Sequence, residues 1–164
     1  MIALEKLSAP STPSDFRPTT LLRFLSKVLE KIAHDQITEY LMGAGLLDPL
    51  QTGFRRFNST DTALLKLTED IRIGIHEKMV TFLLLFDFSK VFDTIPPSRL
   101  IRKLQDMGFS RTPLMWIKTY MIGRSQRVVF ISGEPEYLET NLGVPQGSVL
   151  GPLLFSIWGN LSYF

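Results

Sequence analysis

The residue in this sequence that is best placed for chemistry is Asp87, which directly follows a nearly uninterrupted apolar run over residues 80–86. Such a run predicts a strand covered on both faces, because a half-exposed strand alternates apolar and polar residues. A carboxylate at the end of a buried strand is costly to desolvate unless a partner compensates its charge. Mg²⁺ takes such oxygen ligands together with substrate phosphates, so Asp87 is a candidate metal ligand. Capping of the following turn is the alternative.

Composition restricts the kinds of site that the chain can build. It has no cysteine and 2 histidines, which excludes thiolate and imidazole zinc sites and leaves oxygen as the ligand for any metal. A length of 164 residues suits one domain or two small lobes, and 45% hydrophobic residues suffice for a core. No apolar run is long enough to span a membrane, and the N-terminus lacks a signal-peptide pattern. We expect an intracellular protein with no membrane partner.

Positive charge is concentrated in residues 99–127, although the net charge is only +2. No Lys or Arg follows this basic stretch, and Asp106 is its one acidic residue. Two interpretations remain open: a surface that binds a polyanion, or an ordinary solvated helix face. The basic residues are Arg99, Arg102, Lys103, Arg111, Lys118, Arg124 and Arg127.

Helices are predicted to dominate the first part of the chain. Residues 1–15 are expected to be an irregular lead-in, and residues 16–18 to be extended, because proline disfavours the helical region for the residue before it. Apolar residues at helical spacing predict a helix over about 20–42, with a threonine as N-cap and Gly43 as its stop. A second helix is expected to open at Ser59 or Thr60.

The remainder mixes short helices with a hairpin, which together indicate the α+β class. Two helices are expected between the strand at residues 80–86 and the hairpin, and a buried helix after it. Their predicted positions are a helix capped by Ser98 and ended by Gly108, a helix from Thr112 to Gly123, hairpin strands over 126–131 and 137–142, and a helix over 149–158 capped by Ser148.

Four sequence blocks, in this order and spacing, resemble the reverse transcriptase domain of non-LTR (LINE-type) retrotransposons. The resemblance covers about residues 15–155, and the last two blocks are the most specific. The blocks are Phe16-Arg17-Pro18 with Leu25 to Lys31; Gln51 to Arg55 with Ser59, Thr60 and Ala63; Phe86 to Asp93; and Gly143 to Phe155.

This resemblance implies a partial right-hand polymerase of the α+β class. Fingers would lie over residues 16–78, and an incomplete palm with an antiparallel sheet over residues 79–164. It also implies nucleotidyl transfer by a two-metal mechanism with Mg²⁺ or Mn²⁺. The partners would be an RNA template, a DNA primer and deoxynucleoside triphosphates.

The resemblance also assigns roles to individual residues. Asp87 would be the catalytic metal ligand, and Phe92 the aromatic gate that excludes a ribose 2′-hydroxyl. Gln146 would contact the sugar, and Gly147 would allow close approach to the backbone. Asp93 is given a structural role in the turn. Further expected nucleotide contacts are Phe88, Ser89, Lys90 and Val91 through backbone N–H groups and Arg17 through its guanidinium. Two interpretations of Arg55 stay open, a contact with template or nucleotide and a surface charge. The charged residues of the first long helix, Lys27, Glu30 and Lys31, are expected at its surface.

One departure from the pattern bears on activity, since the sequence contains no Tyr-Ala-Asp-Asp box. We therefore expect a fragment that does not polymerise alone. One aspartate cannot organise two metal ions, and such catalysis depends on the electrostatics that the partner carboxylates supply. A non-catalytic nucleic-acid-binding remnant and an unselected relic are the alternative interpretations. An uncovered apolar sheet edge and marginal stability are also expected.

Overall fold

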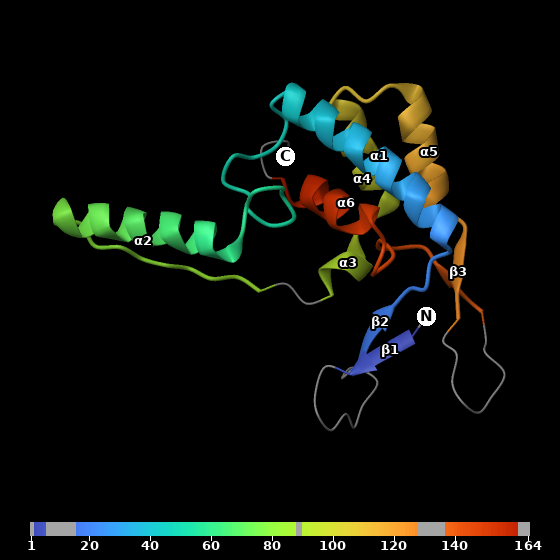
Figure 1. The fold of residues 1–164 in the computed structure, drawn as a ribbon, viewed down its shortest axis with the longest axis horizontal. Helices are drawn as coiled ribbons and strands as arrows, with labels where there is room; N and C mark the ends of the chain where they lie inside the picture. The colour runs from blue at the N-terminus through green and yellow to red at the C-terminus, as the bar shows by residue number, and fades with distance from the viewer. Residues whose placement is uncertain (1, 6–15, 88–89, 128–136, 161–164) are drawn as a thin grey trace.

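The computed structural model describes residues 2–5, 16–87, 90–127 and 137–160. They form a body of packed helices from which a long arm projects (Figure 1). In the body, α6 (Leu150–Gly159) packs against α1 (Phe24–Gly43), α3 (Val91–Thr94) and α4 (Pro97–Asp106). The last of these also packs against α5 (Arg111–Met121).

The hydrophobic core surrounds α6. This helix is almost entirely apolar, and its buried residues include Leu150, Leu154 and Ile157. A helix that is apolar on every side must be buried, as the sequence predicts. Ser148, the predicted cap, accepts a hydrogen bond through its hydroxyl from Gly151 N at 2.9 Å, although the residue at the N-cap position is Val149, whose side chain makes no capping hydrogen bond. Facing core residues are Leu41, Ile95, Leu100, Leu104, Ile117 and Met121.

Two small antiparallel sheets lie at the edge of the body. Strand β1 (Ile2–Glu5) pairs with β2 (Phe16–Thr19), with Ala3 opposite Pro18. The expectation of an irregular lead-in over residues 1–15 is therefore wrong for Ile2–Glu5, which finds a partner in the extended segment that the proline favours. The second sheet pairs β3 (Arg124–Gln126) with β4 (Leu138–Thr140). The predicted second hairpin strand over 137–142 is thus present, whereas the first strand overlaps the expected 126–131 only at Gln126, and residues 128–136 lie outside the described part.

The first long helix begins later than its pattern predicts. Its N-cap is Arg23, which makes no capping hydrogen bond through its side chain. The expected cap was Thr19 or Thr20, but Thr20 instead donates its backbone N–H to Gln146 O at 2.8 Å. None of the helices in the described residues is long and apolar enough to cross a membrane.

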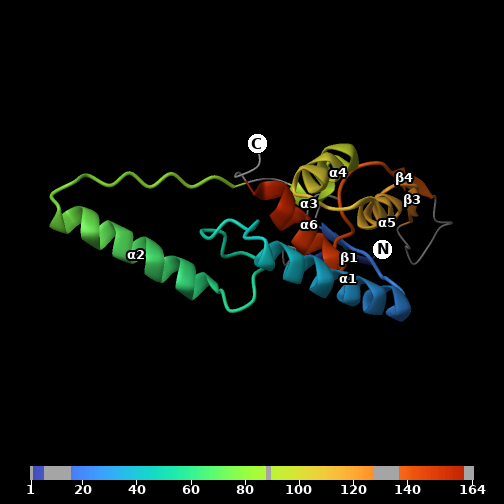
Figure 2. The same ribbon diagram turned by 90° about the horizontal axis from the view of Figure 1, so that it is seen from above.

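The arm consists of α2 (Thr60–His76) and the extended segment that returns from it, residues 79–87. Figures 1 and 2 both show the two running alongside each other away from the body. The N-terminus of α2 is stabilised by a capping box between Ser59 and Thr62. The helix thus begins where the sequence predicts, at Ser59 or Thr60. A hydrogen bond from Met79 N to Gly74 O at 2.8 Å turns the chain back.

The prediction of a buried strand over residues 80–86 is wrong. The segment is extended but has no partner strand in the described residues, and Phe82 is 86% exposed and Leu84 77% exposed. A strand becomes buried only when a sheet receives it, and neither sheet of the described residues lies beside this segment. An apolar run with both backbone edges open is a template for pairing with another chain.

We expect this exposed segment to cause self-association, and Leu84→Lys to increase the proportion of soluble monomer. A charge in the middle of the run opposes edge-to-edge pairing. Size-exclusion chromatography with light scattering at several protein concentrations measures the effect. Leu50→Lys, which changes an exposed leucine of a loop, is the control. Equal monomer fractions in the two variants would contradict the assignment to residues 80–86.

Candidate functional site

The turn over residues 143–148 and the short helix α3 are joined by three hydrogen bonds. Gly143 N donates to Ile95 O at 2.8 Å, and Val144 N donates to Phe92 O at 2.7 Å. The Gln146 side chain donates its Nε2 hydrogen to Asp93 Oδ1 at 2.9 Å. Two of the sequence blocks, 53 residues apart at this bond, therefore meet at one place.

Glycine is required at position 143 for this approach. A Cβ there would lie 2.6 Å from Phe92 O and 2.7 Å from Asp93 Cα, and the backbone has φ +82°. Both the left-handed conformation and the lack of space exclude a side chain. Gly147 (φ +87°) lies against the end of β2, because a Cβ would be 3.1 Å from Thr19 Cγ2 and 3.4 Å from Thr20 O.

A cleft of about 450 Å³ opens beside the Asp93–Gln146 pair. Its lining is mixed in polarity and comes from α3, the 143–148 turn and the β3–β4 sheet. Among the polar residues that line it are Thr20, Asp93, Arg124, Glu139, Thr140 and Gln146. Neither Arg124 nor Thr20 was singled out for this site by sequence reasoning, because nothing local in the sequence shows that they meet the turn.

The Phe92 ring is half-buried in an aromatic cluster. Its centroid lies 4.8 Å from that of Phe155 in α6 and 6.0 Å from that of Phe54 in the connector. These are separations at which aromatic rings attract each other. The cluster therefore contacts the ring of the residue that directly precedes Asp93, although Phe92 is not among the residues that line the cleft.

Asp87 does not lie in this cluster. It is exposed at the end of the arm segment, with no side-chain hydrogen bond or ion pair among the described residues. No group of three or more His, Cys, Asp or Glu side chains that could hold a metal gathers in residues 2–5, 16–87, 90–127 and 137–160. The described residues therefore do not fit a complete metal centre.

The other predicted nucleotide contacts have mixed outcomes. Lys90 is exposed and left-handed (φ 54°) immediately before α3, and Val91 is half-buried in its first turn. Phe88 and Ser89 lie outside the described residues. The backbone of Arg17 pairs with that of Leu4 in the β1–β2 sheet.

Arg55 is occupied within its own loop. Its Nη1 donates to Asp48 O at 2.7 Å and to Gln51 O at 3.3 Å. The guanidinium thereby braces the connector that supplies Phe54 to the aromatic cluster. Its contact with a template or nucleotide stays a prediction.

The expectation that Glu30 is a helix-surface charge is wrong. Its side chain is 3% exposed and accepts hydrogen bonds from the backbone of α6. A signal was available in the sequence, since position 30 shares a helix face with the buried Ile37 and Leu41. Lys31 does lie at the surface, where it pairs with Asp35, and this hydrogen bond, with a further one from His34, lowers the pKa of Asp35.

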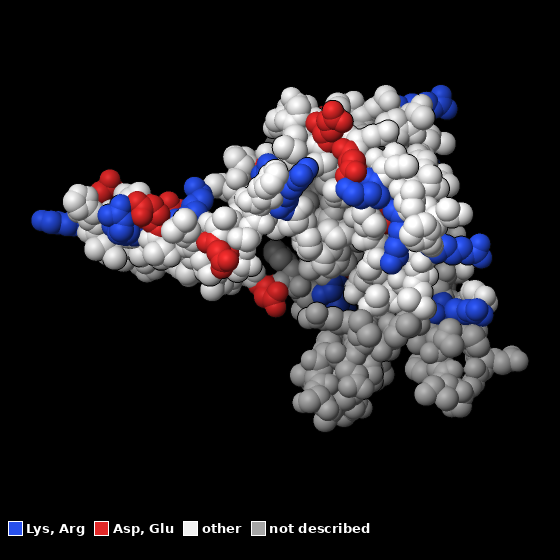
Figure 3. Space-filling view, viewed as in Figure 1, with Lys and Arg blue, Asp and Glu red and all other residues white. Residues whose placement is uncertain are grey.

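The basic stretch is only partly available to a polyanion. Lys103 is 5% exposed and donates to Trp158 O at 3.1 Å and to Asn160 O, and burial lowers its pKa. Arg124 donates to Tyr120 O at 3.0 Å and covers the Tyr120 ring. Figure 3 shows basic side chains along the edge of the body where α5 and β3 lie. Exposed members of the stretch are Arg99, Arg102, Arg111, Lys118 and Arg127.

Comparison with known proteins matches nearly the whole chain to one family. A family model described as reverse transcriptase (RNA-dependent DNA polymerase) matches residues 5–160. The "Probable RNA-directed DNA polymerase from transposon BS" of Drosophila melanogaster is 30% identical over 147 residues, covering 90% of this chain and 16% of that protein.

Two further relatives give the same result. The "Probable RNA-directed DNA polymerase from transposon X-element" of Drosophila melanogaster is 30% identical over 90% of this chain and 16% of its own length. The "RNA-directed DNA polymerase from mobile element jockey" of Drosophila funebris is 28% identical over 91% of this chain and 16% of its own length. The chain thus spans 16% of the length of each of these relatives.

Replacing Gly143 by alanine should destabilise the body more than replacing Gly123. Both glycines have positive φ, which costs a side chain about 1–3 kcal/mol. Only the Gly143 position also places a Cβ against backbone atoms, which adds about 1–3 kcal/mol. Urea unfolding measures the difference, with Gly123→Ala as the control for the conformational cost. Equal losses of unfolding free energy in the two variants would show that the close approach is absent.

Lys103→Ala and Arg102→Ala should affect different properties, stability in the first variant and RNA binding in the second. Removal of the Lys103 ammonium leaves the carbonyls at the end of α6 without this donor and should cost about 1–3 kcal/mol of unfolding free energy. Arg102 is exposed, so its loss should leave stability nearly unchanged but weaken binding of single-stranded RNA in a salt-dependent way. Thermal melting and fluorescence anisotropy distinguish the two. Lys103→Ala that weakens RNA binding as much and leaves the melting temperature unchanged would contradict the burial of Lys103 against the end of α6.

Proposed function

Because the chain belongs to the reverse transcriptase (RNA-dependent DNA polymerase) family, we propose that it supplies the nucleotide-facing part of an RNA-directed DNA polymerase of a retrotransposon. In this proposal residues 16–78 belong to the fingers of a right-hand polymerase, and residues 79–164 to its palm. The partners are an RNA template, a DNA primer and deoxynucleoside triphosphates. Matches to RNA-directed DNA polymerases of mobile elements support the assignment.

The hydrogen bond between Gln146 and Asp93 carries the proposal. It joins the turn and α3, which lie far apart in the sequence, beside a cleft whose lining is mixed in polarity and includes several polar side chains. Nucleotide sites need such convergent polar groups on a supported backbone. A terminal amide bonded through Nε2 to Asp93 still has a second N–H and an oxygen with which to contact a sugar.

Phe92 is proposed to select the sugar. Its ring packs against those of Phe155 and Phe54, and these contacts restrict its movement away from an additional hydroxyl group. An immobile ring rejects a ribose by collision, whereas a loose one would adapt. Asp87 is proposed to supply one carboxylate to a divalent metal site that residues beyond those described complete.

A non-catalytic role in binding nucleic acid is the second candidate. The five exposed basic residues of the 99–127 stretch favour it, because phosphate neutralisation alone can support sequence-independent binding. This role needs neither the Asp93–Gln146 pair nor Asp87.

Nucleotide binding and primer extension separate the two candidates. A fluorescent deoxynucleoside triphosphate should bind the chain, and Gln146→Ala should weaken binding by roughly fivefold, the value of one hydrogen bond. Gln105→Ala, at an exposed glutamine of α4, is the control. We expect no template-dependent primer extension by the chain alone with Mg²⁺ or Mn²⁺.

Two results would contradict the proposal. Nucleotide affinity that Gln146→Ala leaves unchanged would remove the Asp93–Gln146 site from the function and favour the non-catalytic role. Primer extension by the chain that Asp87→Ala abolishes would show that the metal site is complete without further residues.

A further inference from the structure

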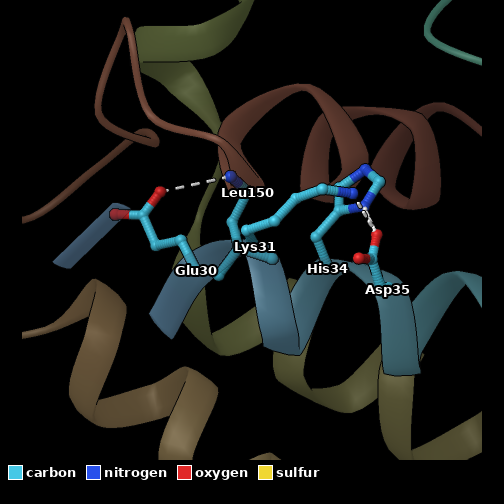
Figure 4. Close-up of polar contacts among 5 residues, drawn as sticks. All are labelled: Glu30, Lys31, His34, Asp35 and Leu150. Atoms are coloured by element: carbon cyan, nitrogen blue, oxygen red, sulfur yellow. Dashed lines mark hydrogen bonds and ion pairs between the residues drawn. The ribbon is translucent and has the colours of Figure 1, made fainter. Parts of the chain in front are cut away.

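Glu30 is a buried carboxylate in the middle of α1. The charged residues beside it, Lys31 and Asp35, pair with each other near the surface, while the Glu30 side chain extends toward the start of α6 (Figure 4). Burial of a carboxylate is costly unless hydrogen bonds compensate it. The polar groups that Glu30 contacts therefore explain why a charge is tolerated at this position.

Those groups are the first backbone amides of α6. Glu30 Oε2 accepts from Val149 N at 2.7 Å and from Leu150 N at 3.3 Å. The first N–H groups of a helix have no partner within the helix, and the helix dipole favours a negative charge at that end. Ser148 caps the next amide, Gly151 N, so side chains from two segments share the start of α6.

The start of α6 is continuous with the turn that carries Gln146. Backbone bonds hold this turn at its other points: Thr20 N donates to Gln146 O at 2.8 Å, and Ser148 N donates to Pro145 O at 3.2 Å. The two amides bound by Glu30 follow Ser148 directly. A shift of Val149 would therefore move the peptide planes that aim the Gln146 side chain at Asp93.

We propose that Glu30 is a positioning residue that acts through Gln146. Its carboxylate anchors residues 149 and 150 to α1 and so sets the direction of the Gln146 amide. The consequence for nucleotide affinity rests on the proposed function, whereas the consequence for the geometry of the turn does not. Glu30 itself touches neither Gln146 nor Asp93 in any hydrogen bond of the described residues.

Variants of the 164-residue chain test this directly. Glu30→Leu removes both acceptor oxygens, Glu30→Gln keeps one, and Glu39→Leu, at an exposed position of the same helix, is the control. The readouts are the hydrogen-exchange rates of the Val149 and Leu150 amides and the side-chain amide resonances of Gln146 in a ¹⁵N–¹H spectrum, assigned with Gln146→Ala.

In Glu30→Leu, exchange at the two amides should accelerate roughly tenfold or more, as expected for the loss of a hydrogen bond to a charge. The Gln146 side-chain resonances should move toward values of a free glutamine. Glu30→Gln, which keeps an acceptor oxygen but loses the charge, should change both signals in the same direction and to a smaller extent, and Glu39→Leu should change neither. If Glu30→Leu does not fold, displaced Gln146 resonances in the folded Glu30→Gln variant support the proposal, and unchanged ones overturn it.

A double-mutant comparison connects the geometry to nucleotide binding. Glu30→Gln should weaken binding of the fluorescent deoxynucleoside triphosphate in the wild-type background but have no further effect in Gln146→Ala. Additive losses would show that Glu30 does not act through Gln146. If Gln146→Ala alone changes nothing, the proposed function fails, and the amide signals still decide the role of Glu30.

Discussion

The approach of the 143–148 turn to α3 requires two backbone segments to come closer than side chains normally allow. Gly143 makes this possible, and the hydrogen bonds from Gly143 N to Ile95 O and from Val144 N to Phe92 O hold it. Everything proposed for the site depends on this contact. It places Gln146 against Asp93 and directs the chain into α6, whose apolar surface then organises the core.

The body and the arm are stabilised by different kinds of interaction. In the body, helices share a core in which Leu104, Ile117 and Leu154 are fully buried. In the arm, α2 relies on its capping box and on local pairs such as Arg72 with Glu69, and the following segment has no sheet to join. Asp87 lies at the end of that segment, so its position is the least constrained among the predicted site residues of the described chain.

Local features of the structure could be predicted from the sequence, and long-range ones could not. The capping box at Ser59, the buried helix after Ser148 and the extended Phe16–Thr19 segment follow from neighbouring residues. Whether residues 80–86 become a buried strand depends on a neighbouring strand from another part of the chain, and the apolar run itself does not show whether one is present. Glu30 and Lys103 were misread for the same reason, because the groups that justify their burial lie at the two ends of α6. Of the candidate site, the residue blocks were identified, but the pairing of Gln146 with Asp93 needed the structure.

The position of Glu30 has a consequence for the order of folding. Its partners are 119 and 120 residues further along the chain, so α1 cannot complete its buried face until α6 has been synthesised. Contacts over such separations close large loops and tend to form late. Until those residues have been synthesised, the Glu30 carboxylate lies among the apolar residues of α1 without these hydrogen bonds. Up to that stage the charge favours hydration over premature collapse of this helix face, and it becomes a stabilising group when the helix amides arrive.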